Sequence, residues 1–206
     1  MKLLSLVVSA YNEEAGLETF YQTTREYGEA LAAKGWGYEF VFVNDGSRDR
    51  TGEILDDLAA RDATHVRVLH FSRNFGHEAA MTAGLDYATG EGLVFMDADL
   101  QHPPKYLADI VDQFDAGYQV ISMVRTENKT AGLLKNITSG GFYWLINRMS
   151  EVHLEANASD FFAITRPVQK VLMHNYREKV RFLRGYVQNV GFRKTTISYE
   201  AAPRVA

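Results

Sequence analysis

The feature that most constrains the fold is a regular alternation between short apolar runs and longer stretches with helical spacing. The apolar runs are rich in Val, Ile, Leu and Phe, as buried strands are; they cover residues 3–10, 39–44, 66–71, 93–96 and 120–124. The stretches between them predict helices at 14–33, 51–60, 77–88 and 104–116. A strand followed by a helix, several times over, predicts an α/β fold with a mostly parallel central sheet flanked by helices.

The pattern becomes less regular after residue 126. A polar stretch at 127–130 precedes a helix candidate at 133–149, a strand-like run at 160–165, a short helix from Pro167, a basic helix around 180–188 and a last strand at 194–199. Thr51 is expected to cap the second helix, and Pro104 to occupy the first position of the fourth. No internal repeat or low-complexity segment is found, and 206 residues fit one domain.

Composition restricts the chemistry that the chain can carry. There is no cysteine, so any metal must be bound by oxygen or imidazole ligands, and an intracellular protein is indicated. No segment approaches the roughly 18 consecutive apolar residues of a membrane span, and the first residues are too short and strand-like for a signal peptide.

Charge is distributed unevenly along the chain. Residues 1–116 contain 20 acidic and 9 basic side chains, whereas residues 161–206 contain 2 acidic and 9 basic ones. The basic end is either a solvated surface or a face that contacts anionic phosphate or lipid headgroups. Charge alone leaves both interpretations open; no nucleic-acid partner is expected.

Polar residues follow the predicted strands, where ligands bind in open α/β sheets. The segments AYNEE (10–14) and NDGS (44–47) are also ordinary turn sequences. Together they suggest a cradle for a nucleotide, with an aromatic ring for the base and carboxylates for hydrogen bonds to base and ribose. Arg73, after the third strand, could contact a diphosphate where the next helix begins.

The fourth strand is followed by Asp97, Asp99 and Gln101 at alternate positions. Two carboxylates and an amide on one side of an extended segment supply hard oxygen ligands, which suit Mg²⁺ or Mn²⁺ bridging a diphosphate. An Asp-x-Asp triplet is common by chance, so the prediction rests on its position directly after a buried strand.

These motifs, in this order and spacing, resemble the inverting glycosyltransferases of family 2, and within them the polyprenyl-phosphate branch of bactoprenol glucosyltransferases and dolichol-phosphate mannose synthases. The resemblance covers nearly the whole chain; it rests on VVSAYNEE (7–14), FVNDGS (42–47), RNFG (73–76), AGLDYATG (83–90), MDADLQHPP (96–104), SDF (159–161) and RFLRG (181–185).

The resemblance implies a GT-A fold, a single Rossmann-like catalytic domain over residues 1–206. Residues 1–100 would be the nucleotide-sugar-binding half, which ends in Asp-x-Asp, and 101–206 the acceptor-binding half. The implied reaction moves a hexose, most simply glucose, from a UDP-sugar to a polyprenyl phosphate, with Mg²⁺ or Mn²⁺ as cofactor. The implied location is the cytoplasmic face of the membrane.

Site residues carry over from the family motifs position by position. The nucleotide-sugar site would contain Ala10, Tyr11, Glu13, Asn44, Asp45, Arg73, Asp97 and Ala98. The metal ligands would be Asp97, Asp99 and Gln101. The acceptor phosphate would meet Arg125, Lys135 and Ser139. The residues expected to act in catalysis are Asp99, Asp160 and Arg125.

The chain departs from the family pattern in three places. Asn44 replaces a common aspartate, Phe162 a common arginine, and Ser9-Ala10 the usual proline-containing turn. The family pattern also continues past Arg204 into a basic interfacial segment and membrane helices, which this sequence does not include. We therefore expect either a piece of a longer chain or a separate membrane-protein partner; a homo-oligomer is left open.

Other functions fit the sequence less well. A dinucleotide-binding oxidoreductase needs Gly-x-Gly-x-x-Gly after the first strand, and an aspartyl phosphatase needs its Asp-x-Asp there. Two rivals stay open: a glycosyltransferase with a hydroxyl acceptor, for a cell-surface polysaccharide, and a sugar-nucleotide-binding subunit without activity.

Overall fold

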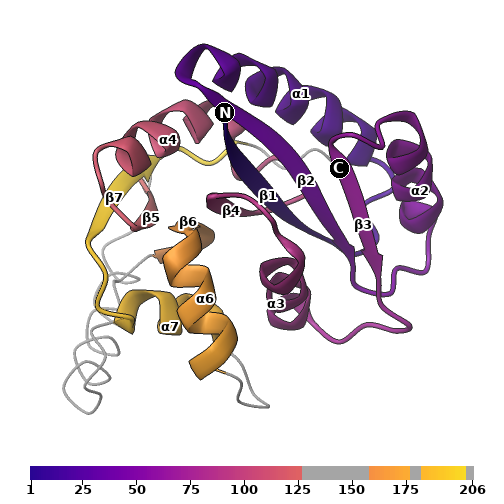
Figure 1. Ribbon diagram of the computed structural model, residues 1–206. Coiled ribbons are helices and arrows are strands. Elements are labelled where there is room, and N and C mark those ends of the chain that lie inside the picture. The colour runs from indigo at the N-terminus through magenta and orange to yellow at the C-terminus, as the bar shows by residue number, and fades with distance from the viewer. Residues whose placement is uncertain (127–157, 177–181, 203–206) are drawn as a thin grey trace, which may run out of the picture.

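The computed structural model describes residues 1–126, 158–176 and 182–202, which form a central sheet between two layers of helices (Figure 1). Within these residues the sheet has seven strands in the order β3-β2-β1-β4-β6-β5-β7. They are β1 (Lys2–Ala10), β2 (Trp36–Asn44), β3 (Val66–His70), β4 (Gly92–Asp97), β5 (Val120–Arg125), β6 (Ala158–Thr165) and β7 (Lys194–Tyr199).

Strand direction decides which chain segments meet at the edge of the sheet. β6 runs antiparallel to its neighbours β4 and β5, and the other neighbouring strands pair in parallel. The carboxyl ends of β1, β2, β4 and β5 therefore lie at the same edge as the amino end of β6. This edge gathers the predicted site segments from both halves of the chain.

Alternate residues along the strands divide between two cores. In β1, Leu4, Leu6 and Val8 belong to one apolar cluster, whereas Val7 belongs to the other. The first cluster is covered by α1 (Leu17–Ala30), η1 (Leu31–Lys34), α2 (Thr51–Arg61), η2 (Pro104–Tyr106) and α4 (Leu107–Asp115). The second is covered by α3 (His77–Tyr87), α6 (Arg166–Asn175) and α7 (Leu183–Asn189), on the opposite face in Figure 1.

Helix α3 lies unusually close to the sheet. A Cβ atom at Gly84 would overlap Cγ1 of Val7 and would approach Cγ2 of Val43 to 3.5 Å. Because α3 touches β1 and β2 at this point, the strands fix its height above the sheet. Its first residue, His77, is thereby placed at the carboxyl edge.

A buried carboxylate on β2 joins the strands to the loop that follows α3. The Glu39 side chain on β2 is nearly inaccessible, and its Oε1 accepts hydrogen bonds from the Ser5 hydroxyl at 2.6 Å and from the backbone and hydroxyl of Thr89, both at 2.8 Å. Buried carboxylates are tolerated when they are hydrogen-bonded in this way. The network joins β1, β2 and the loop after α3.

The predicted strands and helices are confirmed with shifted ends. β2 begins at Trp36 because Trp36, Gly37 and Tyr38 pair with the start of β1. Thr51 was wrongly predicted as the cap: it is the first residue of α2, Arg50 is the N-cap, and Asp49 Oδ1 accepts the Thr51 N–H at 3.0 Å. Pro104 does begin its helix, initially as a 3₁₀ turn.

The second half follows the prediction where it is described. The predicted strand at 160–165 is part of β6, the helix from Pro167 is α6, and the last strand is β7 as expected. The basic helix is α7, which begins at Leu183. The polar stretch at 127–130 and the predicted helix at 133–149 lie outside the described residues. Among the described residues, no helix is both long and apolar enough to cross a membrane.

Candidate functional site

The loops after β1 and β2 are tied to each other through backbone and side-chain hydrogen bonds. The Asn12 N–H donates to Ser47 Oγ at 3.0 Å, and Asn12 Oδ1 accepts the Arg48 N–H at 2.9 Å. Asn12 has φ of 55°, a conformation that asparagine tolerates better than most residues. The Glu13 N–H donates to Thr51 Oγ1 at 2.8 Å. The two predicted nucleotide segments thus form one wall.

This wall borders a hollow of about 170 Å³. Its lining residues are Ser9, Ala10, Tyr11, Asp45, Asn74, Gly76 and His77. Tyr11 is 41% exposed, so its ring is available to a ligand, whereas Ala10 is buried. Three of the predicted nucleotide residues therefore line one hollow, together with residues from the loop before α3.

Asp45 shapes the hollow as well as lining it. Its carboxylate is only 3% exposed and accepts the N–H groups of Phe75 at 2.7 Å and Gly76 at 3.0 Å. Gly46 has φ of 67°, and a side chain there would run into the backbone of Arg73 and Asn74. The ends of β2 and β3 are consequently held in one arrangement.

Asn44 and Arg73, unlike Asp45, do not line the hollow. Asn44 Oδ1 accepts the Ser47 N–H at 2.9 Å, and its Nδ2 lies 3.1 Å from His70 Nδ1, so both of its polar atoms bond within the protein. Arg73 is exposed and lies over the Phe75 ring at 4.0 Å. A nucleotide role for Asn44 would therefore act through the turn, and the roles of Arg73 and Glu13 stay predictions.

The Asp-x-Asp segment forms a tight turn after β4. Asp99 Oδ1 accepts the Gln101 N–H at 2.9 Å, and Leu100 has φ of 62°. A leucine in the left-handed region is uncommon and is often associated with functional sites. The Asp97 side chain is about one-third exposed, whereas Ala98 is buried.

The donor atoms of this segment fit Mg²⁺ or Mn²⁺. Asp97 and Asp99 offer carboxylate oxygens, and Gln101 offers an amide oxygen. No preformed group of three His, Cys, Asp or Glu ligands is found in the described parts of the chain. Such an open set is the kind on which Mg²⁺ combines one or two carboxylates with substrate phosphates and water. The segment fits a metal that binds together with a diphosphate.

His102, which the motif analysis did not assign, supports the same turn. Its Nδ1 accepts the Asp97 N–H at 3.0 Å, which leaves Nε2 as the donor toward Ser159 Oγ at 3.2 Å. Burial lowers the pKa of His102 although Asp97, Asp99 and Asp160 favour the protonated form. The Tyr199 hydroxyl bonds to Ser159 at 2.8 Å, and burial raises the pKa of this tyrosine.

Asp160 on β6 lies close to the end of β4 because the two strands are neighbours. Its Oδ1 is 3.3 Å from Arg184 Nη1 on α7, and its Oδ2 is 3.8 Å from His77 Nε2 on α3. His77 Nδ1 is in turn 3.5 Å from Asp97 Oδ1. The structure therefore brings Asp97, a predicted metal ligand, and Asp160 to either side of one imidazole ring.

His77, Arg184 and Ser9 were not predicted as site residues. The only local sequence signal for His77 is its position after RNFG at a helix start, which is too weak to single out. Ser9 could be assigned only once β1 and β4 were paired, since Ser9 lies opposite Asp97 in that register. These three residues can be recognised as site residues only from contacts between segments that are far apart in the sequence.

The acceptor-side predictions are described only in part. Arg125 is exposed at the end of β5, opposite Tyr199 of β7, at the same edge as Asp160. Lys135 and Ser139 lie outside the described residues. Phe162, which replaces a common arginine of the family pattern, is buried and stacks on Phe95 with ring centroids 4.5 Å apart.

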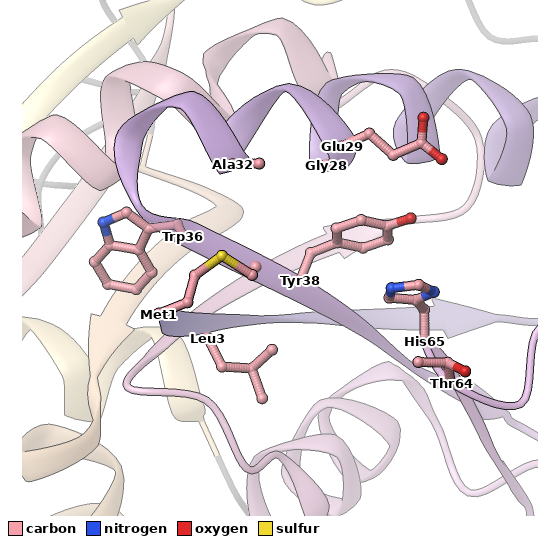
Figure 2. A pocket seen from close by; sticks show the side chains of 10 residues that line it. Met1, Leu3, Gly28, Glu29, Ala32, Trp36, Tyr38, Thr64 and His65 are labelled. Atoms are coloured by element: carbon pink, nitrogen blue, oxygen red, sulfur yellow. The ribbon is translucent and has the colours of Figure 1, made fainter.

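A larger hollow of about 410 Å³ lies away from these groups (Figure 2). It is bordered by the amino-terminal ends of β1 and β2, and its lining includes Met1, Leu3 and Trp36. Tyr38 and His65 stack within it at 4.6 Å. Its lining is mostly apolar and contains none of the predicted site residues, so the smaller hollow at the carboxyl edge is the candidate site.

Comparison with known proteins gives concordant results. The family model described as Glycosyl transferase family 2 matches residues 5–172. An uncharacterized glycosyltransferase of Bacillus subtilis, YkcC, is 39% identical over 98% of the chain, and the bactoprenol glucosyl transferase of Shigella phage SfV is 37% identical over 98%. The chain spans 61% and 64% of the lengths of these two relatives.

Solved structures share the fold at low sequence identity. A mannosyltransferase from Pyrobaculum calidifontis, in complex with GDP-Man and Mn²⁺, superposes with a TM-score of 0.65 at 20% identity, covering 98% of this chain and 57% of that one. A glucosyl-3-phosphoglycerate synthase from Mycobacterium tuberculosis, with Mn²⁺ and UDP, gives 0.55 at 20% identity, covering 81% and 58%. These similarities confirm the GT-A fold expected from the sequence.

Proposed function

The chain belongs to glycosyl transferase family 2, and from this premise we propose that it moves a hexose from a nucleotide-sugar to a polyprenyl phosphate at a membrane surface. One observation carries the proposal: the hollow that Tyr11 and Asp45 line, the Asp-x-Asp turn and Asp160 lie at a single edge of the sheet. The names of the bactoprenol glucosyl transferase relatives support glucose as the sugar and a prenyl phosphate as the acceptor.

The donor half of the reaction would use the segments after β1, β2 and β4. Tyr11 would contact the base, Glu13 and Asp45 would receive hydrogen bonds from the nucleoside, and Arg73 would approach the diphosphate. Asp97, Asp99 and Gln101 would hold Mg²⁺ or Mn²⁺, which supplies charge stabilisation for the departing nucleoside diphosphate. In this proposal residues 1–100 form the donor half and 101–206 the acceptor half.

The acceptor half follows from the chemistry of a phosphate. A phosphate monoester has a second pKa of about 6, so its oxygen is already anionic near neutral pH and needs no base to remove a proton. The protein has to hold that oxygen in line with the anomeric carbon and offset its charge. Arg125 would do so with Lys135 and Ser139, and a single displacement would invert the anomeric centre.

Two exposed basic residues support contact with the membrane. Of the basic residues in the last quarter of the sequence, Arg193 and Lys194 are exposed beside the start of β7. Each Lys or Arg near an anionic bilayer contributes about 1 kcal/mol to binding. A location at the cytoplasmic face of the membrane, and any membrane-protein partner, belong to the same proposal.

Nucleotide binding tests the donor half directly. We expect calorimetry with Mn²⁺ to show UDP-glucose binding more tightly than GDP-mannose, with the binding lost in excess EDTA because the diphosphate then loses its counter-charge. A tighter complex with GDP-mannose would reverse the choice of donor. Binding of UDP-glucose that is unchanged by EDTA would contradict the metal site.

A further inference from the structure

The Ser9 hydroxyl lies between two groups of the site that come from distant parts of the chain. Ser9 Oγ is 2.9 Å from Asp97 Oδ1 and 2.9 Å from His77 Nδ1. A carboxylate can only accept, so the Ser9 hydroxyl donates its proton to Asp97 and accepts the Nδ1–H of His77. These two bonds link β1, β4 and the first turn of α3.

The same arrangement fixes the other side of the imidazole ring. With Nδ1 bonded to Ser9, Nε2 of His77 is directed toward Asp160, 3.8 Å from Oδ2. Nε2 is buried and has no hydrogen-bond partner among the described residues. A polar atom that is buried without a partner costs free energy, so the position of this ring calls for a functional explanation.

The neighbouring elements hold this ring and its carboxylate partner from further directions. α3 cannot move closer to the sheet, because Gly84 already touches Val7. Glu78, next to His77, accepts the Leu183 N–H of α7 at 2.9 Å, and burial raises the pKa of this glutamate. Arg184 of the same helix faces Asp160 at 3.3 Å.

We propose that Ser9 and His77 are positioning residues that set the distance between Asp97 and Asp160, and so align the donor diphosphate with the acceptor. This assignment rests on the proposed function. Ser9 orients a metal-binding carboxylate, and hydrogen bonds of that kind are worth about 10–100-fold in metal affinity or activity. The His77 ring lies between Ser9 and Asp160, with Nε2 3.8 Å from Asp160 Oδ2, so its position limits where the Asp160 carboxylate can lie. A displacement of about 1 Å at a reacting group costs on the order of 100-fold in rate.

The contributions of Ser9 and His77 can be measured separately, because substitution of each residue removes different hydrogen bonds. Ser9→Ala removes the donor to Asp97 and the acceptor for His77 together. His77→Phe keeps a ring of similar size but removes its Nδ1–H, so the bond from Ser9 to Asp97 survives. Ser9→Thr keeps the hydroxyl and suits a β-strand. Ser198→Ala, at an exposed position of β7, is the matched control.

The experiment measures kcat with UDP-glucose and a short-chain prenyl phosphate, and Mn²⁺ binding in the presence of UDP by electron paramagnetic resonance. Ser9→Ala should lower kcat about 10–100-fold and weaken Mn²⁺ binding about 10-fold or more. His77→Phe should lower kcat without changing Mn²⁺ binding. The double variant should be no slower than Ser9→Ala, because the two changes break one link. Ser9→Thr should recover most of the lost rate.

The outcomes distinguish this assignment from the function on which it rests. Two results would overturn the positioning role while leaving the proposed function in place. One is a Ser9→Ala variant with wild-type kcat and Mn²⁺ binding; the other is a double variant in which the effects of the two single changes multiply. A wild-type protein that binds neither UDP with Mn²⁺ nor UDP-glucose would overturn both. Thermal midpoints of all variants close to that of Ser198→Ala are expected, since a merely structural role would lower them.

Discussion

Asp99→Asn is expected to lower turnover by about 10²–10⁴-fold while leaving the fold intact. Metal stabilisation of the departing diphosphate is worth several kcal/mol, and each 1.4 kcal/mol changes a rate about tenfold. Asparagine keeps the oxygen that accepts the Gln101 N–H at 2.9 Å, so the turn that places Leu100 in the left-handed region is preserved. The substitution therefore removes the charge and little else.

The measurement is the initial rate of sugar transfer over a series of Mn²⁺ concentrations, with the thermal midpoint as the check on folding. Asp57→Asn makes the same chemical change at an exposed position of α2 and should leave the rate unaltered. A variant at Asp99 that retains more than about a tenth of the wild-type rate would show that this carboxylate does not hold the metal.

Asp160→Asn is expected to slow transfer to a prenyl phosphate by about 10–100-fold and to leave measurable turnover. The two oxygens of Asp160 face Arg184 and His77, which describes a carboxylate that is held in place. Because the phosphate oxygen is already ionised, no proton has to be removed during attack. Asp160 then orients the sugar or the acceptor, and its amide replacement keeps part of that function.

Arg125→Ala separates acceptor binding from alignment. Arg125 is exposed at the end of β5, and loss of a charge-assisted hydrogen bond of about 1.5–3 kcal/mol should raise the KM for prenyl phosphate roughly 10–100-fold with a smaller change in kcat.

One outcome would contradict the role given to Asp160. If Asp160→Asn is as inactive as Asp99→Asn, and the wild-type rate follows a single carboxylate-like pKa, Asp160 is a general base and the acceptor carries a hydroxyl.

Much of the fold could be predicted because the sheet is built from buried parallel strands. β1, β2 and β4 are continuous apolar runs, since both of their faces are covered by helices. Ends were harder to place: the start of β2 contains Gly37, which carries no side chain to mark a strand. The cap was misplaced at Thr51 because threonine is a preferred N-cap residue, whereas Arg50, the observed N-cap, is not and makes no side-chain cap hydrogen bond.

The position and direction of β6 could not be predicted from local pattern. Its residues 160–165 were recognised as strand-like, but nothing in their sequence states that the strand lies between β4 and β5 and runs against both. This strand is also the one that brings Asp160 beside His77, so a central feature of the site was hidden together with it.

The site residues divide according to the kind of signal that each one gives. Tyr11, Asp45 and Asp97 directly follow strands or end them, and general rules for α/β sheets draw attention to such positions. Ser9, His77 and His102 have no such signal, because they matter through contacts with residues far away in sequence. Asn44 does lie in a motif, and its polar atoms bond to Ser47 and His70, so its role at the nucleotide stays a prediction.

The most direct test of the proposed function is to follow the sugar itself. Protein incubated with radiolabelled UDP-glucose, Mn²⁺ and a short-chain prenyl phosphate in detergent should move the label into an organic-soluble product with the inverted anomeric configuration. The product should disappear when the prenyl phosphate is replaced by the corresponding prenyl alcohol, which lacks the anionic nucleophile. Label that stays in the aqueous phase with the phosphate, or that passes equally well to the alcohol, would contradict a lipid-phosphate glycosyltransferase.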